Sequence, residues 1–101
     1  MTERQQPTDF ESIGRYVVAT ERLAELLQER SAKVRQICAI FEALERPLEK
    51  HEVALLNGTE TENLYRELRE LNSAVNDAVN EANAHARKAG RPVFIIHVDA
   101  R

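Results

Sequence analysis

The sequence predicts a mainly α-helical fold: a long antiparallel helical hairpin followed by one short C-terminal β-strand that we expect oligomerisation to complete. Three observations support this. Residues 9–46 contain no proline and a single glycine. Apolar side chains recur there, and again in the last third of the chain, at the three- and four-residue steps of a helix buried on one side. Residues 93–98, Val-Phe-Ile-Ile-His-Val, are the only stretch with the β-branched and aromatic composition of a strand.

Length and composition limit the possible functions. A chain of 101 residues forms one small domain, and 31% charged against 5% aromatic residues suits elongated helices better than a thick core. The net charge of −3, with both signs interspersed, argues against a nucleic-acid partner. A single cysteine allows no intrachain disulfide, which is typical of a reducing compartment. The polar N-terminus carries no signal-peptide core, and no apolar run approaches the ~20 residues of a membrane span, so we expect a cytoplasmic protein.

The first helix follows a short polar segment, residues 1–8, which we expect to be flexible. Thr8 or Asp9 provides an N-cap, and the apolar pattern continues for about 37 residues, or ~55 Å. The predicted buried positions are Ile13, Tyr16, Val17, Thr20, Leu23, Ala24, Leu27, Val34, Ile37, Cys38, Phe41 and Leu44. Further apolar residues, Val18, Leu26 and Ile40, lie beyond this arc.

This apolar arc covers nearly half of the helix circumference, which is wider than the stripe of an ordinary surface helix. The run from Ile37 through Ile40 to Phe41 is apolar on every side. One neighbouring helix cannot cover such a surface. We therefore expect Ile37, Ile40 and Phe41 to contribute to an oligomer interface.

The connection between the helices begins at Pro47, which ends the first helix because it lacks an N–H group. Residues 48–56 are either a short connecting helix or an irregular link. Thr59 with Glu62 forms a capping-box pattern that we expect to open the second helix.

The second helix has a regular apolar seam at alternating four- and three-residue steps. Its members are Leu64, Leu68, Leu71, Val75, Ala78 and Ala82. Gly90 is the expected stop, in the position that follows a helix C-terminus. Because the connection is short, the helices should fold back on each other, making residues 9–90 a helical hairpin and residues 91–101 a C-terminal strand or tail.

The C-terminal strand requires a partner, because a single strand leaves its backbone N–H and C=O groups unpaired. Antiparallel pairing across the axis of a dimer is the simplest solution. The residues expected in this interface are Val93, Phe94, Ile95, Ile96 and Val98. The alternative is that the segment packs against the hairpin without forming a sheet.

Polar residues form a stripe beside the apolar seam of the second helix. Its members are Tyr65, Arg69, Asn72, Asn76, Asn80, Asn83 and Arg87. Asparagine is a mediocre helix former, so four on one stripe oppose local propensity. One interpretation is a binding site in which amides donate and accept hydrogen bonds, arginine binds an anion and tyrosine stacks. The other is a polar seam between helices or a solvated face.

No pattern of catalytic or metal-binding residues is apparent. His51, His85 and His97 belong to three different elements without the spacing of a metal site, and Cys38 lacks a partner motif and is expected to pack as a small apolar residue. The three glycines are scattered, so the sequence contains no phosphate-binding loop. We expect neither an enzyme nor a bound cofactor or metal.

These observations favour a non-enzymatic interaction protein, a coiled-coil-like homo-oligomer and most simply a dimer. Its size and charge fit a bacterial or phage accessory factor of the inhibitor or assembly type. Such a protein would self-associate and bind a further protein partner. The alternative is a small-ligand-binding oligomer that uses the Tyr/Arg/Asn stripe for an anionic ligand such as a nucleotide.

Overall fold

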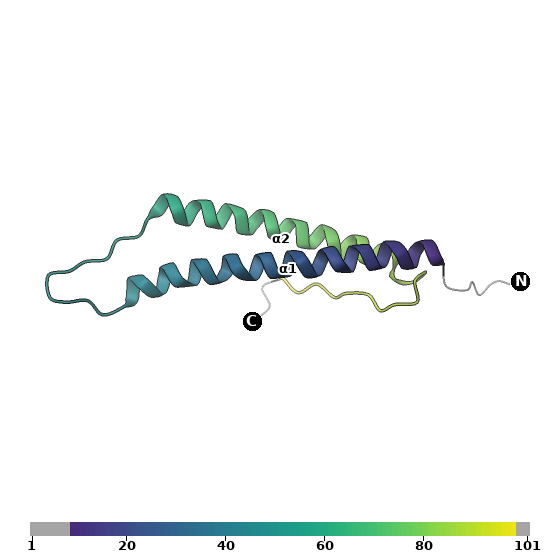
Figure 1. The fold of residues 1–101 in the computed structure, drawn as a ribbon, viewed down its shortest axis with the longest axis horizontal. Helices are drawn as coiled ribbons and strands as arrows, with labels where there is room; N and C mark the ends of the chain where they lie inside the picture. Colours follow the sequence, from purple (N-terminus) through teal and green to yellow (C-terminus); the bar gives the residue numbers. More distant parts are fainter. Residues whose placement is uncertain (1–8, 99–101) are drawn as a thin grey trace, which may run out of the picture.

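Two long antiparallel helices form the body of the molecule in a computed structural model that describes residues 9–98. Helix α1 spans Phe10–Glu45 and helix α2 spans Gly58–Ala86. Residues 91–98 then turn back and run along the helix pair (Figure 1). The molecule measures 80 × 23 × 16 Å, the elongated shape that its composition predicts. The predicted helical hairpin is therefore confirmed.

The N-terminus of α1 is capped as the sequence predicts, by Asp9. The Asp9 carboxylate accepts hydrogen bonds from the Glu11 N–H (3.0 Å) and from the buried Ser12 hydroxyl (3.2 Å). The Asp9 N–H donates to the carbonyl of Lys88 at 3.0 Å, which joins the start of α1 to the end of the hairpin. Helix α1 ends at Glu45, two residues before Pro47.

The connection between the helices contains no helix, so the short helix considered for residues 48–56 is a wrong prediction. The chain instead makes a turn in which the Glu52 N–H donates to the Glu49 carbonyl at 3.0 Å. His51 has a φ of 74° at the third position of this turn, and that left-handed conformation cannot continue an α-helix. Nine residues also gain too few hydrogen bonds to offset the cost of helix nucleation.

The N-cap of α2 lies two residues before the predicted one, whereas the helix ends as predicted. Asn57 is the N-cap, and its side chain accepts a hydrogen bond from the Glu60 N–H at 3.0 Å, so Thr59 lies inside the first turn. At the other end, the Arg91 N–H donates to the Ala86 carbonyl and the Gly90 N–H to the Arg87 carbonyl. With a φ of 69° at Gly90, this pair of bonds is a Schellman motif.

The seam of α1 is rotated by one residue from the predicted one. The positions that face α2 lie at alternating four- and three-residue steps: Ser12, Tyr16, Ala19, Leu23, Leu26, Arg30, Lys33, Ile37 and Ile40. Leu26, expected at the margin, is the most deeply buried large side chain, with 2% of its surface exposed. Seven residues that were expected in the seam are exposed: Val17, Ala24, Leu27, Val34, Cys38, Phe41 and Leu44.

The seam of α2 is confirmed at every predicted position. Leu64, Leu68 and Leu71 are half-buried, whereas Val75, Ala78 and Ala82 are buried. The central cluster comprises Leu23, Leu26, Val75, Ala78 and Val79. Ala82, Ala86 and Ala89 complete the end where α1 begins and α2 ends, and their small side chains allow the two backbones to approach closely.

The predicted C-terminal strand is not confirmed, because residues 9–98 contain no β-ladder. A ladder needs two strands, and the described chain supplies one extended segment. This segment lies along the helix pair, which is the arrangement considered as the alternative. Within the same residues, no helix combines the length and the apolar character needed to cross a membrane.

Candidate functional site

The two flanks of the hairpin differ in character. We call the side on which residues 91–98 lie the tail flank; Tyr16 and Arg30 of α1 and Asn76 and Asn83 of α2 lie on it. The opposite side, the open flank, is a groove between the helices without a covering segment in the described part of the chain. Candidate binding surfaces occur on both.

Asn83 holds the tail by its backbone. The side-chain amide of Asn83 donates to the Phe94 carbonyl at 3.0 Å, and its oxygen accepts from the Phe94 N–H at 2.8 Å. This is the pair of bonds that one strand residue makes with its neighbour in a sheet. Asn83 therefore binds the extended backbone of the tail, and these two bonds do not depend on which side chain residue 94 carries.

Tyr16 provides the second attachment. Its hydroxyl donates to the Pro92 carbonyl at 3.4 Å, and its ring stacks on that of Phe94 with 6.5 Å between centroids. Sequence reasoning placed Tyr16 in the helix seam but did not link it to the tail. No pattern in the sequence connects residues so distant along the chain.

The tail side chains alternate in exposure as those of a strand do. Phe94 and Ile96 are 39% and 49% exposed, whereas Val93 and Ile95 are 59% and 76% exposed. Because successive side chains in an extended chain point to opposite faces, one face of the tail lies toward the hairpin and the other toward solvent. The predicted interface residues of the tail are thus largely uncovered.

A cleft of about 540 Å³ lies between residues 96–98 of the tail and the two helices. It is lined by Arg30, Asn72, Ser73, Val75, Asn76, Val79, Ile96, His97 and Val98. The Arg30 guanidinium donates to the Asn72 side-chain oxygen at 3.0 Å, which fixes both groups at its edge. Amide and guanidinium groups in one concave site are suited to an anion.

The predicted polar stripe of α2 is divided among three places. Tyr65 and Arg69 pair with each other, with the guanidinium 5.8 Å from the ring centroid. Asn72 and Asn76 line the cleft, and Asn83 holds the tail. The remaining members, Asn80 and Arg87, are exposed and do not line the cleft.

An apolar stripe of α1 continues the tail flank. Leu27, Val34 and Phe41 lie seven residues apart and are each 39–49% exposed. Each follows a seam residue by four positions, so the stripe lies on the same side of the seam as Tyr16 and Arg30. Ile37 and Ile40, which were predicted as interface residues with Phe41, are half-buried in the seam itself.

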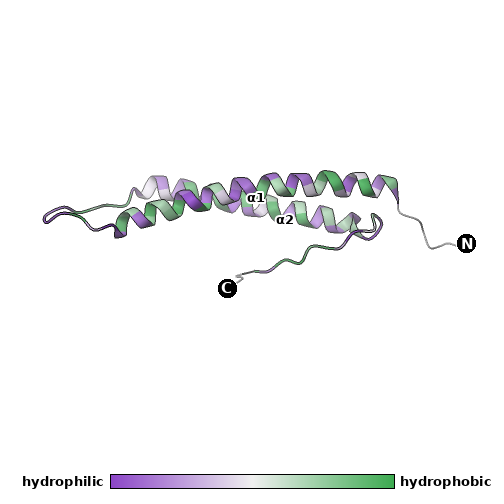
Figure 2. Ribbon diagram, turned by 60° about the horizontal axis from the view of Figure 1, so that its bottom comes forward, coloured by the Kyte–Doolittle hydropathy of each residue, from purple (hydrophilic) through white to green (hydrophobic). Residues whose placement is uncertain are grey.

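The connection between the helices carries apolar residues that sequence reasoning missed as a binding surface. Leu48, Val53, Leu55 and Leu56 are all exposed, and Figure 2 shows hydrophobic colour on this loop, beyond the ends of both helices. The signal for this surface is the number of aliphatic residues in a segment that also contains a turn, Glu49 to Glu52. A turn prevents the segment from burying them on one face of a helix.

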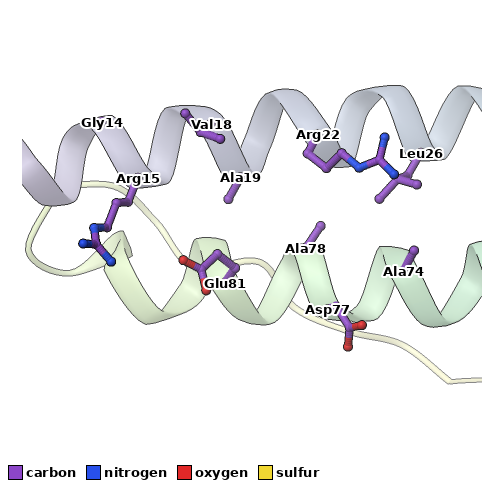
Figure 3. A pocket seen from close by; sticks show the side chains of 10 residues that line it. All are labelled: Gly14, Arg15, Val18, Ala19, Arg22, Leu26, Ala74, Asp77, Ala78 and Glu81. Carbon is purple, nitrogen blue, oxygen red and sulfur yellow. The ribbon is translucent and has the colours of Figure 1, made fainter.

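The open flank holds a groove of about 620 Å³ (Figure 3). Val18, Ala19 and Leu26 of α1 and Ala74 and Ala78 of α2 form its apolar surface. Charged side chains lie on its margins: Arg15 and Arg22 on α1, Asp77 and Glu81 on α2. The small residues make the groove, since they leave room between the two backbones.

One ion pair joins the helices near the middle of the molecule. The Lys33 ammonium lies 2.6 Å from a carboxylate oxygen of Glu67. This hydrogen bond, with the positive charge of Lys33, lowers the pKa of Glu67. Both side chains are partly exposed, so the pair contributes little to the free energy of folding.

No three His, Cys, Asp or Glu side chains gather in residues 9–98 where they could hold a metal ion. Cys38 is exposed, contrary to the prediction that it packs in the core. Comparison of this chain with protein-family models, with curated proteins and with solved structures finds no match. Any functional conclusion therefore depends on the surfaces described above.

Proposed function

We propose that this protein is a non-enzymatic interaction protein that self-associates through its tail flank. The observation that carries the proposal is the apolar stripe Leu27, Val34 and Phe41, left exposed beside a tail whose Val93 and Ile95 are also exposed. Exposed apolar side chains gathered on one flank mark a protein interface on a small protein. An accessory factor of the inhibitor or assembly type, acting as a dimer, fits this surface.

The thin core gives a second reason to favour association. Only two helices contribute to it, and three of its buried members at the end of α2 are alanines, Ala82, Ala86 and Ala89. Small two-layer domains bury too little apolar surface to be very stable alone. Association would bury the half-exposed stripe and contribute roughly 25 cal/mol for each Å² of apolar surface removed from water.

Replacing Leu27 and Val34 together by glutamine is expected to weaken self-association by at least about tenfold, since each replacement puts a polar group into the proposed interface. Sedimentation velocity over a range of concentrations measures the effect. Val18→Gln is the matched control, because Val18 is an exposed apolar residue of the same helix on the open flank. A monomeric wild-type protein at micromolar concentration, or equal weakening by the control, would contradict the proposal.

A second candidate function, supported by the cleft, is binding of a small anionic ligand such as a nucleotide. Arg30, Asn72 and Asn76 supply a cation and amides within about 540 Å³, and oligomer formation would enclose the site further.

For this candidate we expect ATP or inorganic phosphate to raise the melting temperature of the wild-type protein by several degrees at saturation. Arg30→Met should abolish the shift. Arg35→Met, which alters an exposed arginine of the same helix bonded to Ser31, should retain it. The absence of any shift with both probes would remove this candidate.

A further inference from the structure

The tail presents one backbone edge to the hairpin and the other to solvent. The Pro92 carbonyl and both backbone groups of Phe94 point to the helices, where Tyr16 and Asn83 bind them. In an extended chain, the backbone groups of residues two apart point the same way. Even-numbered residues therefore form the inner edge, and Pro92, which has no N–H to offer, lies on that edge.

The outer edge is formed by Val93, Ile95 and His97. Within residues 9–98, none of their backbone N–H or C=O groups makes a hydrogen bond. Unpaired edges of apolar extended segments are templates for another strand. Asn83 and Tyr16 position this edge by holding the opposite one.

We infer that this outer edge pairs in antiparallel fashion with the same edge of a second copy, with Ile95 of each chain on the two-fold axis. The inference rests on the proposed self-association and specifies its geometry. In this register residues i and j pair when their numbers sum to 190, so Val93 lies opposite His97 of the second copy. Phe94 then lies opposite Ile96 of the second copy, an aromatic and β-branched pair of the favourable kind.

The composition of the tail suits a second copy of this chain as the partner. Residues 92–98 contain no Asp, Glu, Lys or Arg, so pairing with an identical segment places no like charges together. With Ile95 on the axis, all three residues of the outer edge pair with one another, whereas moving the axis to Phe94 would place Arg91 opposite His97.

Single cysteines in a Cys38→Ala background test this inference. Paired residues on the axis have Cα atoms about 5.5 Å apart, within the range of a disulfide. Ile95→Cys should therefore form a disulfide-linked dimer with oxidised glutathione. Phe94→Cys and Ile96→Cys should not, because their Cα atoms would lie more than about 7 Å from their own symmetry mates.

The outcomes separate this inference from the proposed function. A wild-type monomer at all concentrations overturns both. A stable dimer in which Phe94→Cys or Ile96→Cys links as fast as Ile95→Cys, or in which none of the three links, leaves self-association standing and overturns the strand pairing. Circular dichroism at the helix bands checks that every variant retains the hairpin.

Discussion

Leu26→Ala is expected to lower the free energy of unfolding by about 2–5 kcal/mol, the largest effect of any single truncation in this protein. Among residues 9–98, Leu26 is the most deeply buried large side chain, and it packs in the cluster with Leu23, Val75 and Val79. The removed methyl groups would leave a cavity between two helices that are held apart by their other side chains. Few other large residues are available to fill it.

Urea denaturation at a fixed protein concentration measures this effect, since association also contributes to apparent stability. Leu55→Ala is the matched control, because Leu55 is an exposed leucine in the connection between the helices. It should change the unfolding free energy by less than about 0.5 kcal/mol. A loss below about 1 kcal/mol for Leu26→Ala would show that the seam of α1 is placed wrongly.

Ala82→Leu is expected to destabilise the protein by about 1–3 kcal/mol for the opposite reason, overpacking. Ala82 has no exposed surface, and Ala86 and Ala89 at the same end of the hairpin are also buried. A leucine there would push the backbones apart and disturb neighbouring contacts of the tail. Its greater helix propensity cannot offset that strain, because leucine and alanine differ little in propensity.

Thermal unfolding followed by circular dichroism measures this second effect. Ala84→Leu is the control, because Ala84 is exposed on the same helix two residues away and has the same chemical change. The control should melt within a few degrees of the wild type. Equal melting of the Ala82 and Ala84 variants would contradict the close approach of α1 and α2 at this end.

The helices and most of their ends were predictable because their signals are local. Asp9 caps a helix through its own side chain, and Gly90 ends one through its own φ angle. The seam of α2 was predictable because its leucines and alanines form a single narrow stripe. Residues 48–56 were ambiguous because their helix propensity competes with a turn that only the left-handed conformation of His51 reveals.

The seam of α1 was not predictable because the helix carries two overlapping apolar stripes. One contains Leu23 and Leu26, and the other, one residue further round, contains Leu27 and Val34. Both have the same period, so periodicity alone cannot tell which one faces α2. Ser12, Arg30 and Lys33 lie in the observed seam although they are polar. Arg30 and Lys33 bond to side chains of α2, and Ser12 bonds to the Asp9 carboxylate at the N-cap.

The sequence by itself determined the two helices, the turn back between them and the presence of an extended apolar segment at the end. These follow from helix period, capping groups and β-branched composition, which act over a few neighbouring residues. Only the tertiary structure decided which stripe of α1 is buried and that Asn83 and Tyr16 hold the tail by one edge. Those outcomes depend on contacts between residues 11 to 76 positions apart, which no local pattern encodes.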